Sequence, residues 1–173
     1  ISMFIVCPFD SMGATMATYG GQNAGGYKLD RLHKGLGSCI ILGAVYSVIG
    51  LLIIAAFGPH LLKLFVSGSE TGILADAQHF LLINGLFYFP LALVNIVRFM
   101  IQGMGFGFFA IIAGVLEMAA RTLVGAVFVP IFGYNAACFA SPLAWIFADC
   151  FLIPAYFVVW NRMKRHKEAY RQV

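Results

Sequence analysis

Long apolar segments separated by short polar ones make up most of the chain. Four of them are longer than the ~20 residues that a helix needs to cross the hydrocarbon core of a membrane. They cover residues 36–57, 77–101, 107–131 and 135–160, and a fifth at 1–19 is about long enough. The pattern predicts an all-α fold, a polytopic transmembrane bundle of about five helices.

Composition supports this class. Of the 173 residues, 61% are hydrophobic and 10% are charged, whereas a soluble domain carries about 25% charged residues. We expect a membrane bundle over residues 1–161 and a basic tail over 162–173. The chain begins at Ile1 inside an apolar segment, without an initiator Met or a signal-peptide n-region, which we interpret as a fragment of a longer protein.

The basic residues predict an orientation. If the five segments cross the membrane in turn, nine Lys and Arg side chains fall on one side and only Lys63 on the other. The nine are Lys28, Arg31, Lys34, Arg98, Arg162, Lys164, Arg165, Lys167 and Arg171. The positive-inside rule places them, with the tail, in the cytoplasm. We therefore expect a multi-pass protein of the cell membrane whose basic residues contact the lipid bilayer and not nucleic acid.

A glycine-rich stretch, GGQNAGG at 20–26, follows the first segment. It lacks both the GxxxxGK[ST] order of a P-loop and the GxGxxG spacing of a dinucleotide fingerprint. Glycine allows a helix to end and the chain to turn tightly. The stretch predicts a cytoplasmic hairpin between two helices, in which Gln22 and Asn23 cap freed carbonyls.

Ionisable side chains at membrane depth are costly unless they are paired or hydrated, and are functional candidates by default. Asp10, Glu117, Arg121 and Asp149 are the candidates for coupling to a cation. Glu117 and Arg121 lie at i and i+4 and can pair, so a structural pair is favoured over a coupling site there. For Asp149 and Asp10 a coupling role and a structural role weigh equally.

The segment 77–101 carries a polar stripe, because Asn84, Tyr88 and Asn95 are spaced by four and seven residues. These side chains either contact a solute in a cavity or form hydrogen bonds between helices. Pro90 is expected to kink this helix, since it lacks a backbone N–H.

No enzyme chemistry is indicated. The sequence contains no GxGD, HExxH or Ser–His arrangement, and no catalytic residue is proposed. The four cysteines are isolated from one another, so we expect no metal site.

One element resembles a known family. The sequence GQNAGGYKLDRLHKG at 21–35 resembles the GQN-x-GAG-x-x-x-R-I element of multidrug and toxic compound extrusion (MATE) transporters, where it follows the second helix of the C-terminal lobe. The matching positions are Gly21, Gln22, Asn23, Gly25 and Arg31. LLKLF (61–65), QHFLLINGLFY (78–88) and SPLAWIFAD (141–149) follow in the order of that lobe.

The resemblance implies twelve helices in two six-helix lobes, and efflux of small organic, often cationic compounds driven by H⁺ or Na⁺ without another cofactor. This chain would be an incomplete C-terminal half whose partner is the missing N-terminal lobe. Some members carry an ion-binding acid on the helix matching 77–101, but this segment has no Asp or Glu within the membrane. The main coupling acid of such a protein can therefore lie in the N-terminal lobe.

Two alternatives remain at this point. A lipid-linked oligosaccharide flippase of the same superfamily would need several basic residues in its cavity, and only Arg98 and Arg121 are available. A non-catalytic membrane subunit would not need acids near the middle of the membrane.

Overall fold

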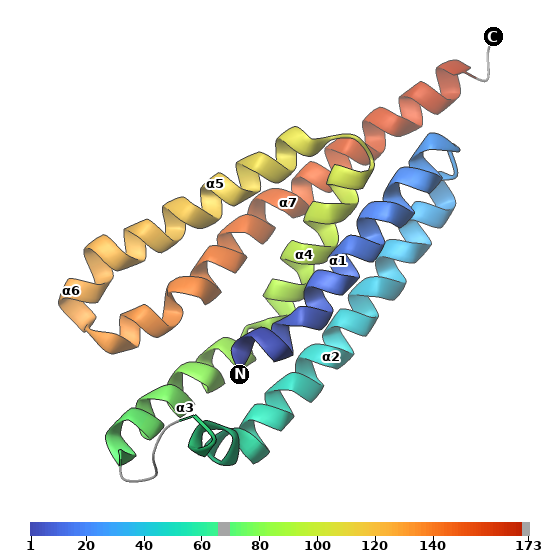
Figure 1. Cartoon of the computed structure of the whole chain (residues 1–173). Helices are drawn as coiled ribbons and strands as arrows, with labels where there is room; N and C mark the ends of the chain where they lie inside the picture. The colour runs from blue at the N-terminus through green and yellow to red at the C-terminus, as the bar shows by residue number, and fades with distance from the viewer. Residues whose placement is uncertain (66–69, 171–173) are drawn as a thin grey trace.

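The computed structural model describes residues 1–65 and 70–170, with side chains up to Glu168. All regular secondary structure in these residues is helical, which confirms the all-α prediction (Figure 1). The elements are α1 (Ser2–Gly25), α2 (Leu29–Lys63), α3 (Thr71–Leu86), α4 (Tyr88–Gly103), α5 (Gly107–Leu123), the π-helical turn η1 (Val124–Phe128), α6 (Val129–Phe132) and α7 (Tyr134–Tyr170).

Three helical units among the described residues are long and apolar enough to cross a membrane. They are α2, the unit Gly107–Phe132 formed by α5, η1 and α6, and α7. The bent pair of α3 and α4 makes a fourth if it is one span. The helix α1, predicted as a fifth span, does not belong to this set, because Asp10 and many Gly, Ser and Thr residues lower its apolar character.

The helix α4 lies at the centre of the bundle. It packs against α1 and α2 on one side and against α5 and α7 on the other (Figure 1). Most of its side chains are buried, including Val94, Ile96, Met100 and Ile101. A buried polar group on α4, such as Asn95, is therefore held between two helical hairpins, α1–α2 and α5–α7.

The predicted kink in segment 77–101 is a full break. The helix α3 ends at Leu86 and α4 begins at Tyr88, with the two axes bent by 52°. Pro90 accounts for the position, because a proline cannot donate to the carbonyl four residues earlier and its ring clashes with it. That carbonyl belongs to Leu86, the last residue of α3.

Glycines bring α1 and α4 into close contact. A Cβ added at Gly20 would lie 3.0 Å from the carbonyl oxygen of Met100, and one added at Gly103 would overlap the backbone of Ala17. Small residues allow this approach between membrane helices, where backbones pack directly. The glycine contacts fix α1 against the central helix.

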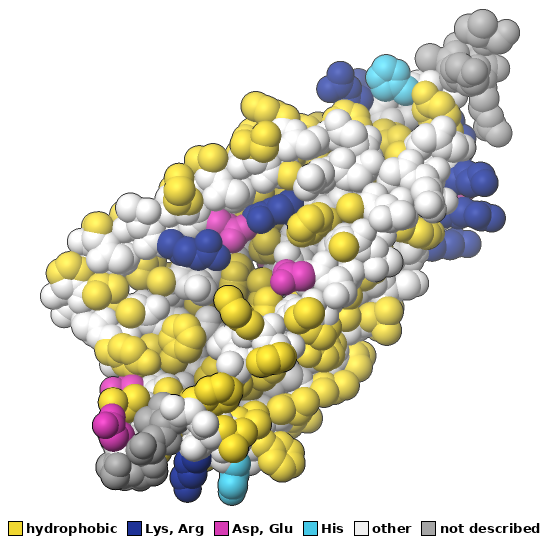
Figure 2. Space-filling view, viewed as in Figure 1, with side chains coloured by type: hydrophobic (Ala, Val, Ile, Leu, Met, Phe, Trp, Pro, Cys, Tyr) yellow, Lys and Arg dark blue, Asp and Glu magenta, His cyan; other side chains and the backbone are white. Residues whose placement is uncertain are grey.

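The surface is that of a membrane protein. Large apolar side chains are exposed along α2, as at Ile41, Leu42, Val48 and Leu52, and hydrophobic side chains cover much of the visible face (Figure 2). Lys and Arg side chains gather at the end that holds the α1–α2 turn and the C-terminal end of α7 (Figure 2). The basic tail is not a separate unit up to Tyr170, because α7 continues through it.

Candidate functional site

Glu117 is the centre of the charged cluster within the bundle. It lies on the buried face of α5 and is 7% exposed. Arg121, one helical turn later, donates from Nη2 to Glu117 Oε2 at 3.0 Å. The predicted i, i+4 pair is therefore present.

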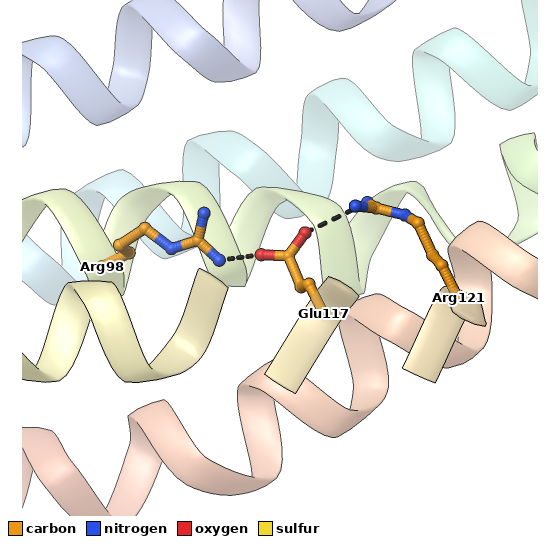
Figure 3. A network of polar contacts seen from close by, with 3 residues as sticks. All are labelled: Arg98, Glu117 and Arg121. Carbon is orange, nitrogen blue, oxygen red and sulfur yellow. Dashed lines mark hydrogen bonds and ion pairs between the residues drawn. The ribbon is translucent and has the colours of Figure 1, made fainter. Parts of the chain in front are cut away.

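A third residue joins this pair from another helix. Arg98 of α4 forms an ion pair with the other oxygen, Glu117 Oε1, so that Glu117 lies between two guanidinium groups (Figure 3). The charge pattern assigns Arg98 to the cytoplasmic basic side, and in the structure its side chain turns towards Glu117 inside the bundle. The position of Arg98 within the apolar segment 77–101 could have indicated that it pairs with an acid inside the bundle.

Asp149 of α7 is the second buried acid. It is 7% exposed, and its Oδ1 has no hydrogen-bond partner among the described residues. It is close enough to Arg98 for the two charges to interact electrostatically. Arg98 thus interacts with an acid of α5 and with an acid of α7.

Asp10 lies apart from this cluster. It is exposed on α1, and no hydrogen bond or ion pair joins it to another residue in the described ranges. The four predicted coupling candidates therefore divide into a paired glutamate with its arginine, a buried unpaired aspartate and an exposed aspartate.

The polar stripe lies in the interior of the bundle. Asn84, Tyr88 and Asn95 are all buried, and the break between α3 and α4 separates the first from the second. Asn84 Nδ2 donates to the carbonyl of Phe80 at 2.9 Å. The Tyr88 ring packs 5.8 Å from that of Phe9, and its hydroxyl has no described partner.

A turn between α1 and α2 is present as predicted, but most of the glycine-rich stretch does not form it, because residues 20–25 are the last turns of α1 and only Gly26 lies outside the helix. The helix α1 ends at Gly25, and the amide of Lys28 donates to the carbonyl of Asn23 at 2.9 Å. The side chain of Asn23 donates to the carbonyl of Tyr19 at 2.9 Å, while that of Gln22 is exposed. Gly21 and Gly25 line a cavity of about 500 Å³ at this turn.

Tyr19 fixes the hairpin, which the sequence did not indicate. Its hydroxyl donates to the carbonyl of Arg31 at 2.8 Å and so joins α1 to α2. Gly35 allows this contact, because a Cβ there would overlap the Tyr19 ring. Arg31 itself is exposed and contributes its backbone carbonyl to this bond.

The family model MatE matches residues 1–131 of the chain. The chain belongs to the MatE family. This membership confirms the resemblance to MATE transporters, and it makes the chain a multi-pass membrane protein of a transport family. No curated protein and no solved structure matches it.

The part matched by the MatE model holds the hairpin, Asp10 and the Arg98–Glu117–Arg121 cluster, whereas Asp149 lies beyond it on α7. Within the described residues, no group of three or more His, Cys, Asp or Glu side chains is placed to hold a metal ion.

Proposed function

We propose that this chain forms part of a secondary active multidrug exporter, which exchanges H⁺ or Na⁺ for small organic, chiefly cationic compounds. The observation that carries the proposal is the buried Asp149 carboxylate, which has no hydrogen-bond donor at Oδ1 in a helix of a MatE-family bundle. In this proposal Asp149 is the residue of the chain that takes up the coupling ion.

Burial explains why Asp149 suits that role. An ionised carboxylate away from water is costly unless it is paired. Binding of H⁺ or Na⁺ removes that cost, so the ion and the conformation of the surrounding helices influence each other. Glu117 differs, because arginines approach both of its oxygens and supply opposite charge.

Alternating access follows from this coupling. In the two-lobe arrangement of the family, ion binding near the middle of the membrane favours one of two lobe conformations, and the solute leaves in the other. Asn84, Tyr88 and Asn95 would contact the solute only in a conformation that opens the bundle, since they are buried here. The N-terminal lobe supplies the other wall of the cavity.

The proposed location is the cell membrane, with the C-terminus in the cytoplasm. Basic side chains at the α1–α2 turn and at the end of α7 support this orientation (Figure 2). Arg98 no longer counts towards it, because it pairs with Glu117.

An efflux assay with the full transporter that contains this chain tests the proposal. A cationic dye is loaded into proteoliposomes, and its movement is driven by an imposed H⁺ or Na⁺ gradient. We expect Asp149→Asn to reduce ion-driven efflux at least about tenfold, because the carboxylate that takes up the ion is gone. Cys150→Ser, at the exposed neighbouring position, should keep wild-type efflux.

Wild-type efflux in Asp149→Asn, with an unchanged dependence on the ion gradient, would remove Asp149 from the mechanism. Translocation of a labelled polyprenyl diphosphate lipid without any dye efflux would instead identify a flippase. The two described arginines at membrane depth are both bound to Glu117, which leaves little free positive charge for such a substrate.

A further inference from the structure

Arg98 lies between two acids that belong to different helices. It forms an ion pair with Glu117 of α5 and interacts electrostatically with Asp149 of α7. Because α4 packs against both helices, the charge of this one side chain acts on both acids. The arrangement is a single cation placed between two carboxylates.

The unsatisfied atoms of this cluster are complementary. Arg98 Nη2 pairs with Glu117 Oε1, but Arg98 Nε is buried without a hydrogen-bond partner among the described residues, as is Asp149 Oδ1. Unsatisfied buried groups cost free energy that a hydrogen bond between them would recover. A donor and an acceptor that lack partners therefore lie on the two helices of the α4–α7 contact.

Arg121 makes it possible for Arg98 to leave Glu117. It holds Glu117 Oε2 at 3.0 Å, so the glutamate keeps one counter-ion when Arg98 moves away. Arg121 and Arg98 also repel each other across the shared carboxylate. Glu117 therefore binds Arg98 less strongly than it would if Arg121 were absent.

We propose that Arg98 is a positioning residue that changes partner. It pairs with Glu117 while Asp149 is protonated, and with Asp149 once that acid has released its proton to water. The inference rests on the proposed role of Asp149 as the coupling acid. The exchange transfers an ion pair from the α4–α5 contact to the α4–α7 contact. The charge on Asp149 therefore decides which of the two helices is joined to α4 by the ion pair of Arg98.

The other titratable groups on the packed helices lie outside this exchange. Arg121 remains on Glu117, and Asp10 of α1 is exposed. His79 of α3 is bonded to Asn135 at the far end of α7. The Tyr156 hydroxyl of α7 and the Cys39 thiol of α2 are buried neutral groups.

Infrared titration of the full chain in lipid nanodiscs tests the proposal without any transport. The carbonyl band of protonated Asp149 is identified by its loss in Asp149→Asn, and its pH midpoint is followed. Arg98→Gln should raise the midpoint by about one to three pH units, because the anion loses its cation. Arg98→Lys should restore it towards the wild-type value, and Arg162→Gln on the exposed end of α7 should leave it unchanged.

The double variant separates an exchange of partners from a simple effect of distance. Glu117→Gln frees Arg98 for Asp149 and should lower the midpoint, but it should have no further effect once Arg98 is Gln. An equal lowering by Glu117→Gln in both backgrounds would overturn the proposal, because Glu117 would then act on Asp149 without Arg98. If the effects of Glu117→Gln and Arg98→Gln are additive while Asp149→Asn loses ion-driven efflux, the partner exchange is refuted and the transport role stands. If the effects are not additive while Asp149→Asn keeps normal efflux, the transport role is refuted and the exchange stands.

If Arg98→Gln does not fold, solid-state NMR of the wild-type chain decides the question. The Arg98 guanidinium should contact the Glu117 carboxyl carbon at acid pH and the Asp149 carboxyl carbon at alkaline pH. An Arg98–Glu117 contact that persists unchanged across the titration would overturn the proposal.

Discussion

At the scale of single residues, an arginine inside the bundle and a tyrosine at its end have the clearest roles. Arg98 pairs with a buried acid, and Tyr19 joins two helices through one hydrogen bond. The apolar pattern contains both positions but does not tell which way a long side chain turns. That direction depends on a partner far away in the sequence, and so Glu117 was predicted to pair with Arg121 but not with Arg98.

Tyr19→Phe tests the bond that closes the hairpin. Loss of the hydroxyl removes the donor to the Arg31 carbonyl, and we expect the free energy of unfolding to fall by about 1 kcal/mol. Thr18→Val is the matched control, because the Thr18 hydroxyl bonds only within its own helix, to Ala14. Thermal unfolding in detergent measures both variants, and equal changes would show that the Tyr19 bond adds nothing between α1 and α2.

At the scale of helices, the position of α4 decides the architecture. It is the second half of a broken helix, and it separates the α1–α2 hairpin from the α5–α7 hairpin. The helical segments and the kink caused by Pro90 were predictable, because apolar length and proline act locally. The contact of α1 with α4 was not predictable. These helices are far apart in the chain and pair through small residues, and the hydrophobic pattern does not identify which helix a small residue contacts.

Gly103→Ala tests that contact. The added methyl group meets the backbone of Ala17, which cannot move aside as a side chain would. We expect a loss of about 1–3 kcal/mol or more in unfolding free energy, as for other overpacked sites. Gly114→Ala is the control, because nothing lies within 4 Å of a Cβ there, and alanine favours a helix.

Thermal unfolding of the two glycine variants gives the comparison directly. The midpoint should fall for Gly103→Ala and should stay level or rise for Gly114→Ala. A Gly103→Ala protein as stable as the Gly114→Ala protein would mean that α1 does not approach α4 as closely as the structure has it.

At the scale of the whole molecule, the chain supplies one of the two sets of helices that the proposed alternating-access mechanism needs. The MatE family relationship carries the transport assignment, while the coupling ion and the solutes belong to the proposed function. The sequence identified the family through the hairpin motif, because that turn is built from adjacent residues. It listed Asp149 only as one of several acids, since burial and missing donors are properties of the folded bundle.

We expect the isolated chain to insert into liposome membranes without transporting a dye across them. One lobe cannot close alternately towards both sides of the membrane, so no solute is occluded and exchanged. Dye efflux from proteoliposomes that contain the isolated chain measures this, with the full transporter as the positive control. Ion-driven efflux by the isolated chain would contradict the two-lobe mechanism.

The length of α7 has a practical consequence for imaging. This helix runs from the bundle into the basic end of the chain as far as Tyr170. A rigid helical protein fused in register to it would take its orientation from the bundle, and each inserted residue would turn that marker by about 100° and advance it by about 1.5 Å. A small membrane protein with little mass outside the bilayer would then gain a fixed alignment marker for electron cryomicroscopy.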